Sequence, residues 1–123
     1  MAEKFPQKKK WKTFGNTEQS NEFQCFYCND RLNDFNRTVD HIIPKAMGGI
    51  LSNDNKVFAC KRCNQFKADT DPEMFLGMVK FLTKQMDQDH AQKMAYYRAL
   101  TINLTKLVKG QNEKGKGDNK SSS

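Results

Sequence analysis

Four cysteines and the polar residues between them are the groups in this sequence best suited to chemistry. The cysteines form two pairs with two residues between the partners, Cys25 with Cys28 and Cys60 with Cys63. Four thiolates close a tetrahedral shell around one zinc ion, and a closed shell is structural, not catalytic. We therefore predict one structural zinc site, with reduced structural cysteines or a redox pair as the alternatives.

Between the two cysteine pairs, Asp40 is followed directly by His41, which is one of two histidines in the chain. A neutral imidazole is a suitable general base near pH 7, and a carboxylate supplies an anionic oxygen ligand for a metal ion. Metal-dependent hydrolysis of a phosphodiester needs both functions at one point. An Asp-His pair alone also fits a histidine with a purely structural role, so other residues have to decide between the two.

Short elements are expected to position these groups. The sequence predicts a strand, a second antiparallel strand and a helix, over residues 37–43, 56–59 and 61–69. Pro44 ends the first strand, and Gly48-Gly49 marks a loop that needs unusual backbone angles. Because strand neighbours point to opposite faces, Asp40 and His41 can act on one phosphate only if the strand bends or ends there.

The full pattern is specific in its spacing. It reads Cys25-x-x-Cys28, Asp40-His41-Ile42-Ile43-Pro44, Gly48-Gly49, Asn55 and Cys60-x-x-Cys63-Asn64-x-x-Lys67. These residues resemble the HNH endonucleases that carry a four-cysteine zinc site. The resemblance implies an α+β fold, with a small two-stranded antiparallel sheet and a helix around one catalytic metal ion. It also implies that the protein cuts DNA.

The resemblance assigns a role to each matching residue. Asp40 and Asn64 would hold the divalent ion, and His41 would be the general base. Asn55 would bond across the loop to hold His41, and Lys67 would contact phosphate. Asn64 stands where the family often has histidine, so both protein ligands are oxygen donors, which suit Mg²⁺ or Mn²⁺. One such site makes one cut, so a monomer should nick DNA, and a double-strand break needs a dimer or two events.

Composition is consistent with a DNA-binding role. The chain has 123 residues, a net charge of +7 and 37% hydrophobic residues, which fits one small metal-stapled domain with tails and a polyanionic partner. Contacts mainly to the DNA backbone are expected from Lys67, Arg62, Lys45, Lys8, Lys9 and Lys10. No membrane span and no secretory signal is expected, so the prediction is a cytoplasmic protein, with a viral or mobile-element origin as one option.

Four segments are predicted along the chain. They are a basic flexible arm over 1–21, the nuclease core with its zinc site over 22–70, a helical extension over 71–109 and a disordered tail over 110–123. The arm, with Trp11, either lies along phosphates or is a solvated tail whose tryptophan packs back on the core. Asp71-Pro72-Glu73 predicts a helix start, and the extension forms two helices or one helix bent near Gln88.

The apolar residues are assigned to packing. Leu32 and Phe35 are expected in the small core, and Phe23, Phe26 and Tyr27 around the zinc site. The helical stripe is expected to contain Phe75, Met78, Val79, Leu82, Met86, Met94, Tyr97, Leu104 and Val108. This stripe is a packing surface or the interface of a homodimer.

Two other functions remain open at this point. One is a zinc-stabilised nucleic-acid-binding module without catalysis, which fits the basic arm and the cysteines but leaves Asp40, His41, Asn55 and Asn64 unexplained together. The other is an accessory factor whose helices dock on a partner in a DNA-processing or packaging complex.

Overall fold

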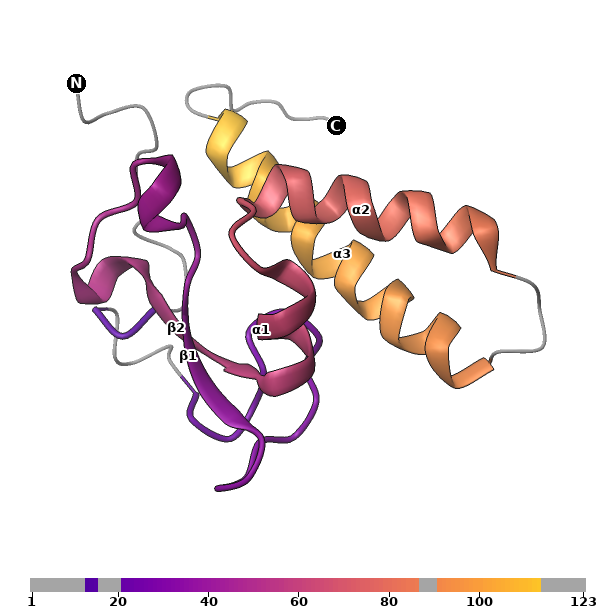
Figure 1. The fold of residues 1–123 in the computed structure, drawn as a ribbon, viewed down its shortest axis with the longest axis horizontal. Coiled ribbons are helices and arrows are strands. Elements are labelled where there is room, and N and C mark those ends of the chain that lie inside the picture. Colours follow the sequence, from indigo (N-terminus) through magenta and orange to yellow (C-terminus); the bar gives the residue numbers. More distant parts are fainter. Residues whose placement is uncertain (1–12, 16–20, 87–90, 114–123) are drawn as a thin grey trace.

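A two-stranded antiparallel sheet followed by a helix forms the centre of the molecule (Figure 1). The computed structural model describes residues 13–15, 21–86 and 91–113. Strand β1 spans Arg37–His41, β2 spans Lys56–Cys60, and α1 spans Lys61–Lys67 directly after β2. Together with the cysteine cluster and two further helices, this arrangement confirms the predicted α+β class.

Strand β1 ends at His41, which is the condition that the Asp-His pair required. His41 lies opposite Lys56 in the register of the sheet. Two residues later, the backbone N–H of Ile43 donates to Oδ1 of Asn55 at 2.9 Å instead of joining a backbone ladder. The strand is therefore shorter than the predicted range 37–43, because a side chain replaces the partner strand at this point.

The loop between the strands is held by two short 3₁₀ turns, η2 over Lys45–Met47 and η3 over Asn53–Asn55. Gly48 has a φ of 91°, in the left-handed region that glycine adopts without strain. Gly49 packs so closely that a Cβ atom there would lie 1.8 Å from the carbonyl oxygen of Ile43. Both glycines are thus required by the backbone path of the loop, as the sequence predicted.

The first cysteine pair lies on a tight turn. The N–H of Cys25 donates to the carbonyl oxygen of Asp30 at 2.8 Å, and Asn29 adopts a left-handed φ of 70°. Asparagine tolerates this conformation better than most residues, so it suits this position of the turn. Of the aromatic residues within the turn, Tyr27 is fully buried and Phe26 is partly buried against the core.

The packing predicted for two other phenylalanines is wrong. Leu32 is buried as expected, but Phe35 is 84% exposed and Phe23 is 57% exposed. The side chain of Asn33 accepts hydrogen bonds from the N–H groups of Phe35 and Asn36, at 2.8 and 3.0 Å. These bonds fix a turn that directs Phe35 into solvent, so local turn geometry overrides its apolar character.

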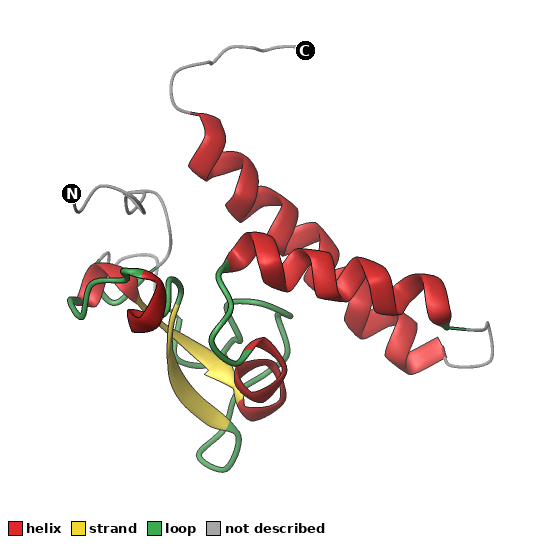
Figure 2. Ribbon diagram, turned by 45° about the horizontal axis from the view of Figure 1, so that its top comes forward, coloured by secondary structure: helices red, strands yellow, loops and turns green. Residues whose placement is uncertain are grey.

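The C-terminal extension forms two helices, α2 over Pro72–Gln85 and α3 over Ala91–Glu113, which lie side by side (Figure 2). Asp71 caps α2, because its side chain accepts a hydrogen bond from the N–H of Met74 at 2.9 Å. Residues 87–90, between the two helices, lie outside the described residues. The two-helix alternative is therefore the one that the structure adopts.

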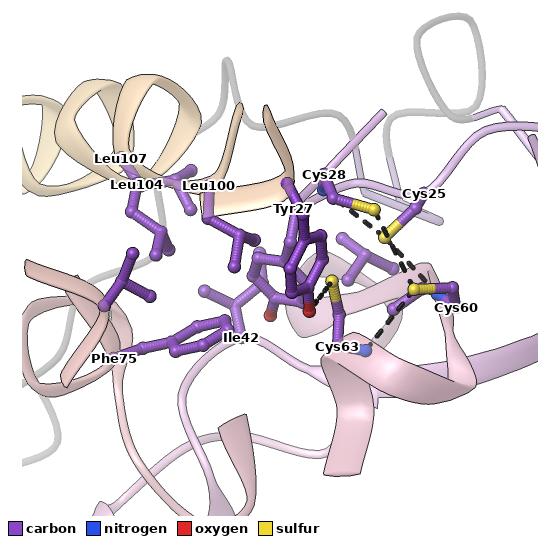
Figure 3. Packing of buried hydrophobic residues seen from close by; sticks show 14 of the residues in the cluster. Cys25, Tyr27, Cys28, Ile42, Cys60, Cys63, Phe75, Leu100, Leu104 and Leu107 are labelled. Carbon is purple, nitrogen blue, oxygen red and sulfur yellow. Dashed lines mark hydrogen bonds between the residues drawn. The ribbon is translucent and has the colours of Figure 1, made fainter. Parts of the chain in front are cut away.

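One hydrophobic core joins the helices to the sheet and to the turn that carries Cys25 and Cys28 (Figure 3). Both the predicted core segment, 22–70, and the predicted extension, 71–109, contribute to it. Among its fully buried members are Tyr27, Ile42, Ile43, Val57, Phe75, Val79, Leu100 and Leu104. On α3 the buried residues are Tyr96, Leu100, Leu104 and Leu107, so only Leu104 of the predicted stripe on this helix is buried. The other predicted residues of this helix, Met94, Tyr97 and Val108, are only partly buried, and Tyr97 packs against the core.

Part of the predicted arm pairs with the sheet. The N–H of Phe14 donates to the carbonyl oxygen of Lys56 at 2.9 Å, and the ring of Phe14 lies 4.5 Å from that of Phe58. Residues 1–12, with the Lys8–Lys10 run and Trp11, and residues 114–123 lie outside the described residues. In the part of the chain that the structure describes, no helix has the length and apolar character needed to cross a membrane.

Candidate metal centres

The four cysteines meet at one buried point, although the two pairs are far apart in the sequence (Figure 3). Their four sulfur atoms all lie within 4.8 Å of one another, and none of them is in a disulfide. The sulfurs of Cys28 and Cys60 are 3.8 Å apart. A tetrahedral zinc ion with Zn–S bonds of about 2.3 Å requires sulfur separations of about 3.8 Å. The cluster therefore fits a four-thiolate zinc site.

Backbone amides support negative charge on these sulfurs. The N–H of Cys60 donates to Sγ of Cys25 at 3.3 Å, and the N–H of Cys63 donates to Sγ of Cys60 at 3.3 Å. The sulfurs are also close enough to share protons: hydrogen bonding with Cys25 lowers the pKa of Cys60 and raises the pKa of Cys63. A zinc ion would replace these protons, since it binds thiolates.

Asp40 is the acidic residue at the second candidate centre, and its side chain is buried. Its Oδ2 atom accepts a hydrogen bond from the hydroxyl of Tyr27 at 2.7 Å and lies 3.2 Å from Nζ of Lys67. Burial, and then the negative charge of Asp40, raise the pKa of Tyr27 well above its usual value. The phenol therefore stays protonated and donates to the carboxylate.

His41 is the last residue of β1 and is half-buried. Its carbonyl oxygen accepts a hydrogen bond from Nζ of Lys67 at 2.9 Å. Asp40 points toward α1, where its carboxylate meets Lys67, and His41, the last residue of β1, lies opposite Lys56 in the register of the sheet. The same lysine thus contacts both members of the Asp-His pair.

Asn55 closes the loop behind His41 and is fully buried. Its Nδ2 atom donates to the carbonyl oxygens of Ile43 and Ile50, at 2.8 and 2.9 Å, while its Oδ1 accepts from the N–H of Ile43. The side-chain amide therefore makes the bonds across the loop that the sequence predicted, and it bonds to the backbone two residues after His41.

Asn64 brings α1 to the same place. Its Nδ2 atom donates to Oγ1 of Thr38 at 3.0 Å and to the carbonyl oxygen of Val39 at 3.5 Å. Both contacts are on β1, next to Asp40. The amide nitrogen is engaged with the strand, and no hydrogen bond from the described residues reaches the amide oxygen of Asn64, which can therefore act as a metal ligand. Carboxylate and amide oxygens are the donor types that Mg²⁺ and Mn²⁺ prefer, so the donor set fits such an ion.

The basic residues predicted to contact DNA differ in their burial and in their ion pairs. Lys67 is fully buried and paired with Asp40, so in this structure its ammonium group is not available to a phosphate and that prediction is corrected. The guanidinium of Arg62 stacks 3.7 Å from the ring of Tyr96 and pairs with Asp30 at 3.2 Å. Lys45 is exposed on the loop near His41.

The contacts of two tyrosines near the sites were not predicted from the sequence, although Tyr27 itself was expected around the zinc site. Tyr27 contacts Asp40, and the hydroxyl of Tyr96 lies 3.2 Å from Sγ of Cys63. A buried tyrosine needs a hydrogen-bond partner for its hydroxyl, so a tyrosine inside a Cys-x-x-Cys turn was the available signal for Tyr27. No comparable signal pointed to Tyr96, which lies 33 residues from Cys63 in the sequence.

Comparison with known proteins fits this geometry. Residues 25–78 match a family model described as HNH endonuclease. This segment is similar to the HNH endonucleases. It contains all four cysteines as well as Asp40, His41, Asn55 and Asn64.

Relatives of the HNH segment include much larger proteins. A CRISPR-associated endonuclease Cas9 from Corynebacterium diphtheriae is 40% identical over 53 residues, which are 42% of this chain and 5% of that protein. The crystal structure of the Type II-C Cas9 enzyme from Actinomyces naeslundii aligns with a TM-score of 0.42 and 22% identity, over 67% of this chain and 10% of that one. The chain therefore spans only a small part of each of these two proteins.

Proposed function

We propose that this chain is a metal-dependent endonuclease that hydrolyses phosphodiester bonds in DNA. The observation that carries the proposal is the convergence of Asp40, His41, Asn55 and Asn64 at the junction of β1, the following loop and α1, within the segment that matches the HNH family. A zinc-binding scaffold alone would not require these four residues at one place.

Asp40 and Asn64 are proposed to hold a Mg²⁺ or Mn²⁺ ion through their side-chain oxygens. When bound, the divalent ion supplies Lewis-acid stabilisation of the charge that develops on the scissile phosphate and on the leaving oxygen. The two residues come from different elements, and the hydrogen bonds of Asn64 to β1 fix their separation. Their positions therefore depend on the packing of α1 against the sheet.

His41 is proposed to take the proton from the attacking water. A general base has to be held in one orientation, and two contacts restrict the backbone around His41. Lys67 donates to its carbonyl oxygen, and Asn55 fixes the backbone of Ile43 from the turn η3 that precedes β2. The residue is only partly buried, and a group that meets a DNA phosphate has to remain accessible.

The four-cysteine zinc site has a structural role in this proposal. Its ligand shell is complete with four thiolates, so no position remains open for water or substrate. The cysteines belong to the same buried cluster as Tyr27, Phe75 and Leu100 (Figure 3). Zinc binding therefore contributes to folding, because the sheet and α1 are too small to bury a core alone.

Binding to DNA is proposed to occur mainly through the phosphate backbone. The net charge of +7 favours a polyanion, and Lys56 lies opposite His41 on the same face of the sheet. Exposed Lys45 lies on the adjacent loop. Affinity should fall steeply as salt increases, because such binding releases counterions. One catalytic site makes one cut, so a monomer nicks DNA.

A plasmid assay tests the proposal. Zinc-loaded protein is incubated with supercoiled DNA and Mg²⁺ or Mn²⁺, and conversion to open circles is followed on agarose gels. The proposal expects nicking that requires the added ion and that is lost in the Asp40→Asn variant. Retardation of DNA on a gel without cutting under any divalent ion would instead favour the non-catalytic binding module.

A further inference from the structure

Tyr27 connects three parts of the molecule. It lies in the turn between the zinc ligands Cys25 and Cys28, and its hydroxyl donates to Oδ2 of Asp40 at 2.7 Å. Its carbonyl oxygen accepts a hydrogen bond from Nδ2 of Asn103 on α3 at 2.7 Å. Its ring meets the ring of Phe75 on α2 edge-on, with the centroids 5.6 Å apart. The zinc-binding turn and both C-terminal helices therefore fix the position of one hydroxyl group.

The carboxylate that receives this hydroxyl is bonded on one side only. Both donors, Tyr27 and Lys67, contact Oδ2 of Asp40, and the side chains of both donors are fully buried. Among the described residues, no hydrogen bond is made to the other oxygen, Oδ1. A carboxylate held through one oxygen presents the second in a fixed direction, which is the arrangement that a ligand to a metal ion needs.

We infer that Tyr27 is a positioning residue for the divalent-ion site, acting through the carboxylate of Asp40, and that Lys67 assists it. This inference rests on the proposed function, because it assumes that Asp40 is a metal ligand. It replaces the phosphate contact expected for Lys67 with a role inside the protein. It also gives the zinc-binding turn a second task, since the residue between two zinc ligands sets the geometry of the catalytic centre.

The two donors differ in how firmly they hold the carboxylate. The ring of Tyr27 is fixed by packing and has few rotatable bonds, so its hydroxyl defines a direction. Lys67 reaches Asp40 with a flexible four-carbon chain and shares its ammonium group with the carbonyl oxygen of His41 at 2.9 Å. Tyr27 should therefore control the orientation of Asp40, while Lys67 mainly balances its charge and ties it to His41.

The alternative is that the hydroxyl of Tyr27 needs a hydrogen-bond acceptor inside the core and has no further role. In that case Asp40 is a convenient acceptor, and loss of the hydroxyl should change stability without changing the affinity of the centre for a metal ion. Metal affinity therefore distinguishes the two roles. Replacing a hydrogen-bond partner of a metal ligand typically weakens metal binding by about 10- to 100-fold.

The experiment measures the affinity of zinc-loaded protein for Mn²⁺, from the electron paramagnetic resonance signal of the free ion. Four thiolates retain zinc in the presence of Mn²⁺, because Mn²⁺ prefers oxygen ligands. The variants are Tyr27→Phe, Asp40→Asn and the double variant. Tyr97→Phe is the matched control, because Tyr97 lies in the same aromatic cluster, with its ring 6.0 Å from that of Phe66. Zinc content and circular dichroism establish that each variant is folded.

We expect Tyr27→Phe to weaken Mn²⁺ binding by about 10- to 100-fold and to have no further effect in the Asp40→Asn background. The inference is overturned if the Mn²⁺ affinity of Tyr27→Phe lies within about twofold of that of the Tyr97→Phe control. It is also overturned if Tyr27→Phe weakens Mn²⁺ binding equally in the unmodified protein and in the Asp40→Asn background. If Asp40→Asn itself leaves Mn²⁺ binding unchanged, the proposed catalytic centre fails as well.

Asn103→Ala provides a second variant should Tyr27→Phe fail to retain zinc. It removes the 2.7 Å bond that holds the backbone of Tyr27 and leaves the hydroxyl in place. Weaker Mn²⁺ binding that depends on Asp40 supports the inference. Binding equal to that of the unmodified protein overturns it.

Discussion

Gly49→Ala should damage the fold at the loop that follows His41. The new Cβ atom would lie 1.8 Å from the carbonyl oxygen of Ile43 and 3.0 Å from Nδ2 of Asn55. Cβ atoms in proteins essentially never approach other atoms closer than 3.0 Å, so the backbone of Ile43 must move by roughly 1.2 Å. Because the clash involves backbone atoms on both sides, no rotation of a side chain relieves it.

The size of the effect follows from the bonds that this movement breaks. Nδ2 of Asn55 donates to the carbonyl oxygen of Ile43 at 2.8 Å, and a shift of about 1.2 Å takes the pair beyond hydrogen-bonding distance. A buried polar group left without its partner costs about 1–3 kcal/mol, and each lost hydrogen bond about 1 kcal/mol. We therefore expect the free energy of unfolding to fall by about 2–4 kcal/mol.

Urea denaturation of zinc-loaded protein measures this change, with circular dichroism as the signal. Gly77→Ala is the matched control, because a Cβ atom at Gly77 would meet nothing within 4 Å and the residue lies inside α2. Alanine in a helix is favoured over glycine by about 0.5–1 kcal/mol, so the control should be more stable than the unmodified protein. If Gly49→Ala unfolds within about 0.5 kcal/mol of the unmodified protein, the close packing of this loop is refuted.

Three further perturbations address the zinc site, the buried ion pair and the buried phenol. Cys60→Ser should lose zinc and fold together, since the zinc ligands hold the core; elemental analysis that finds zinc in a folded variant would contradict this. Lys67→Met leaves the buried carboxylate of Asp40 without its cation, so the free energy of unfolding in urea should fall by about 3–5 kcal/mol. Arg62→Met breaks a largely exposed ion pair and should lower it by less than about 1 kcal/mol. If both substitutions lowered the free energy of unfolding equally, the expected difference between the buried and the exposed ion pair would be refuted. The pKa of Tyr27 is raised above 10.0 by burial and by Asp40, so its phenol favours the folded state below pH 10 and loses this contribution as pH rises further. The absorbance of ionised tyrosine near 295 nm should therefore rise identically in Tyr27→Phe and in the unmodified protein until the latter unfolds; a smaller rise in the variant while the fold persists would show that Tyr27 titrates normally.

The parts of the fold that were predictable from the sequence are those set by local patterns. Pro44 and the Gly48-Gly49 pair marked the loop, and Asp71 marked the start of α2 through its capping side chain. The two cysteine pairs predicted the cluster because their ligand type and number leave few other solutions.

Contacts between segments that are distant in the sequence could not be predicted from it. Lys67 was expected to contact phosphate because of the family resemblance, but it is buried against a partner 27 positions earlier, Asp40. Phe35 was assigned to the core on its apolar character, while the hydrogen bonds of Asn33 direct it outward. In both cases the environment, and not the residue type, determines burial.

In the candidate site, too, the residues were predictable from the sequence, whereas the contacts that hold them were not. The identity of Asp40, His41, Asn55 and Asn64 came from their spacing and from the family resemblance. What holds them in place came from the structure. Tyr27 acts across 13 positions and Asn64 contacts β1 across 26, and neither pairing follows from a helical or strand period.

The measurement that tests the central claim most directly compares His41→Ala with His90→Ala in single-turnover nicking of supercoiled DNA with Mn²⁺. His90 is the other histidine of the chain and lies outside the HNH segment, residues 25–78. A general base contributes about 10²- to 10⁴-fold to the rate. We predict a loss of that size for His41→Ala, with zinc content and fold retained, and an unchanged rate for His90→Ala. A His41→Ala variant that nicks DNA as fast as the unmodified protein would contradict the account.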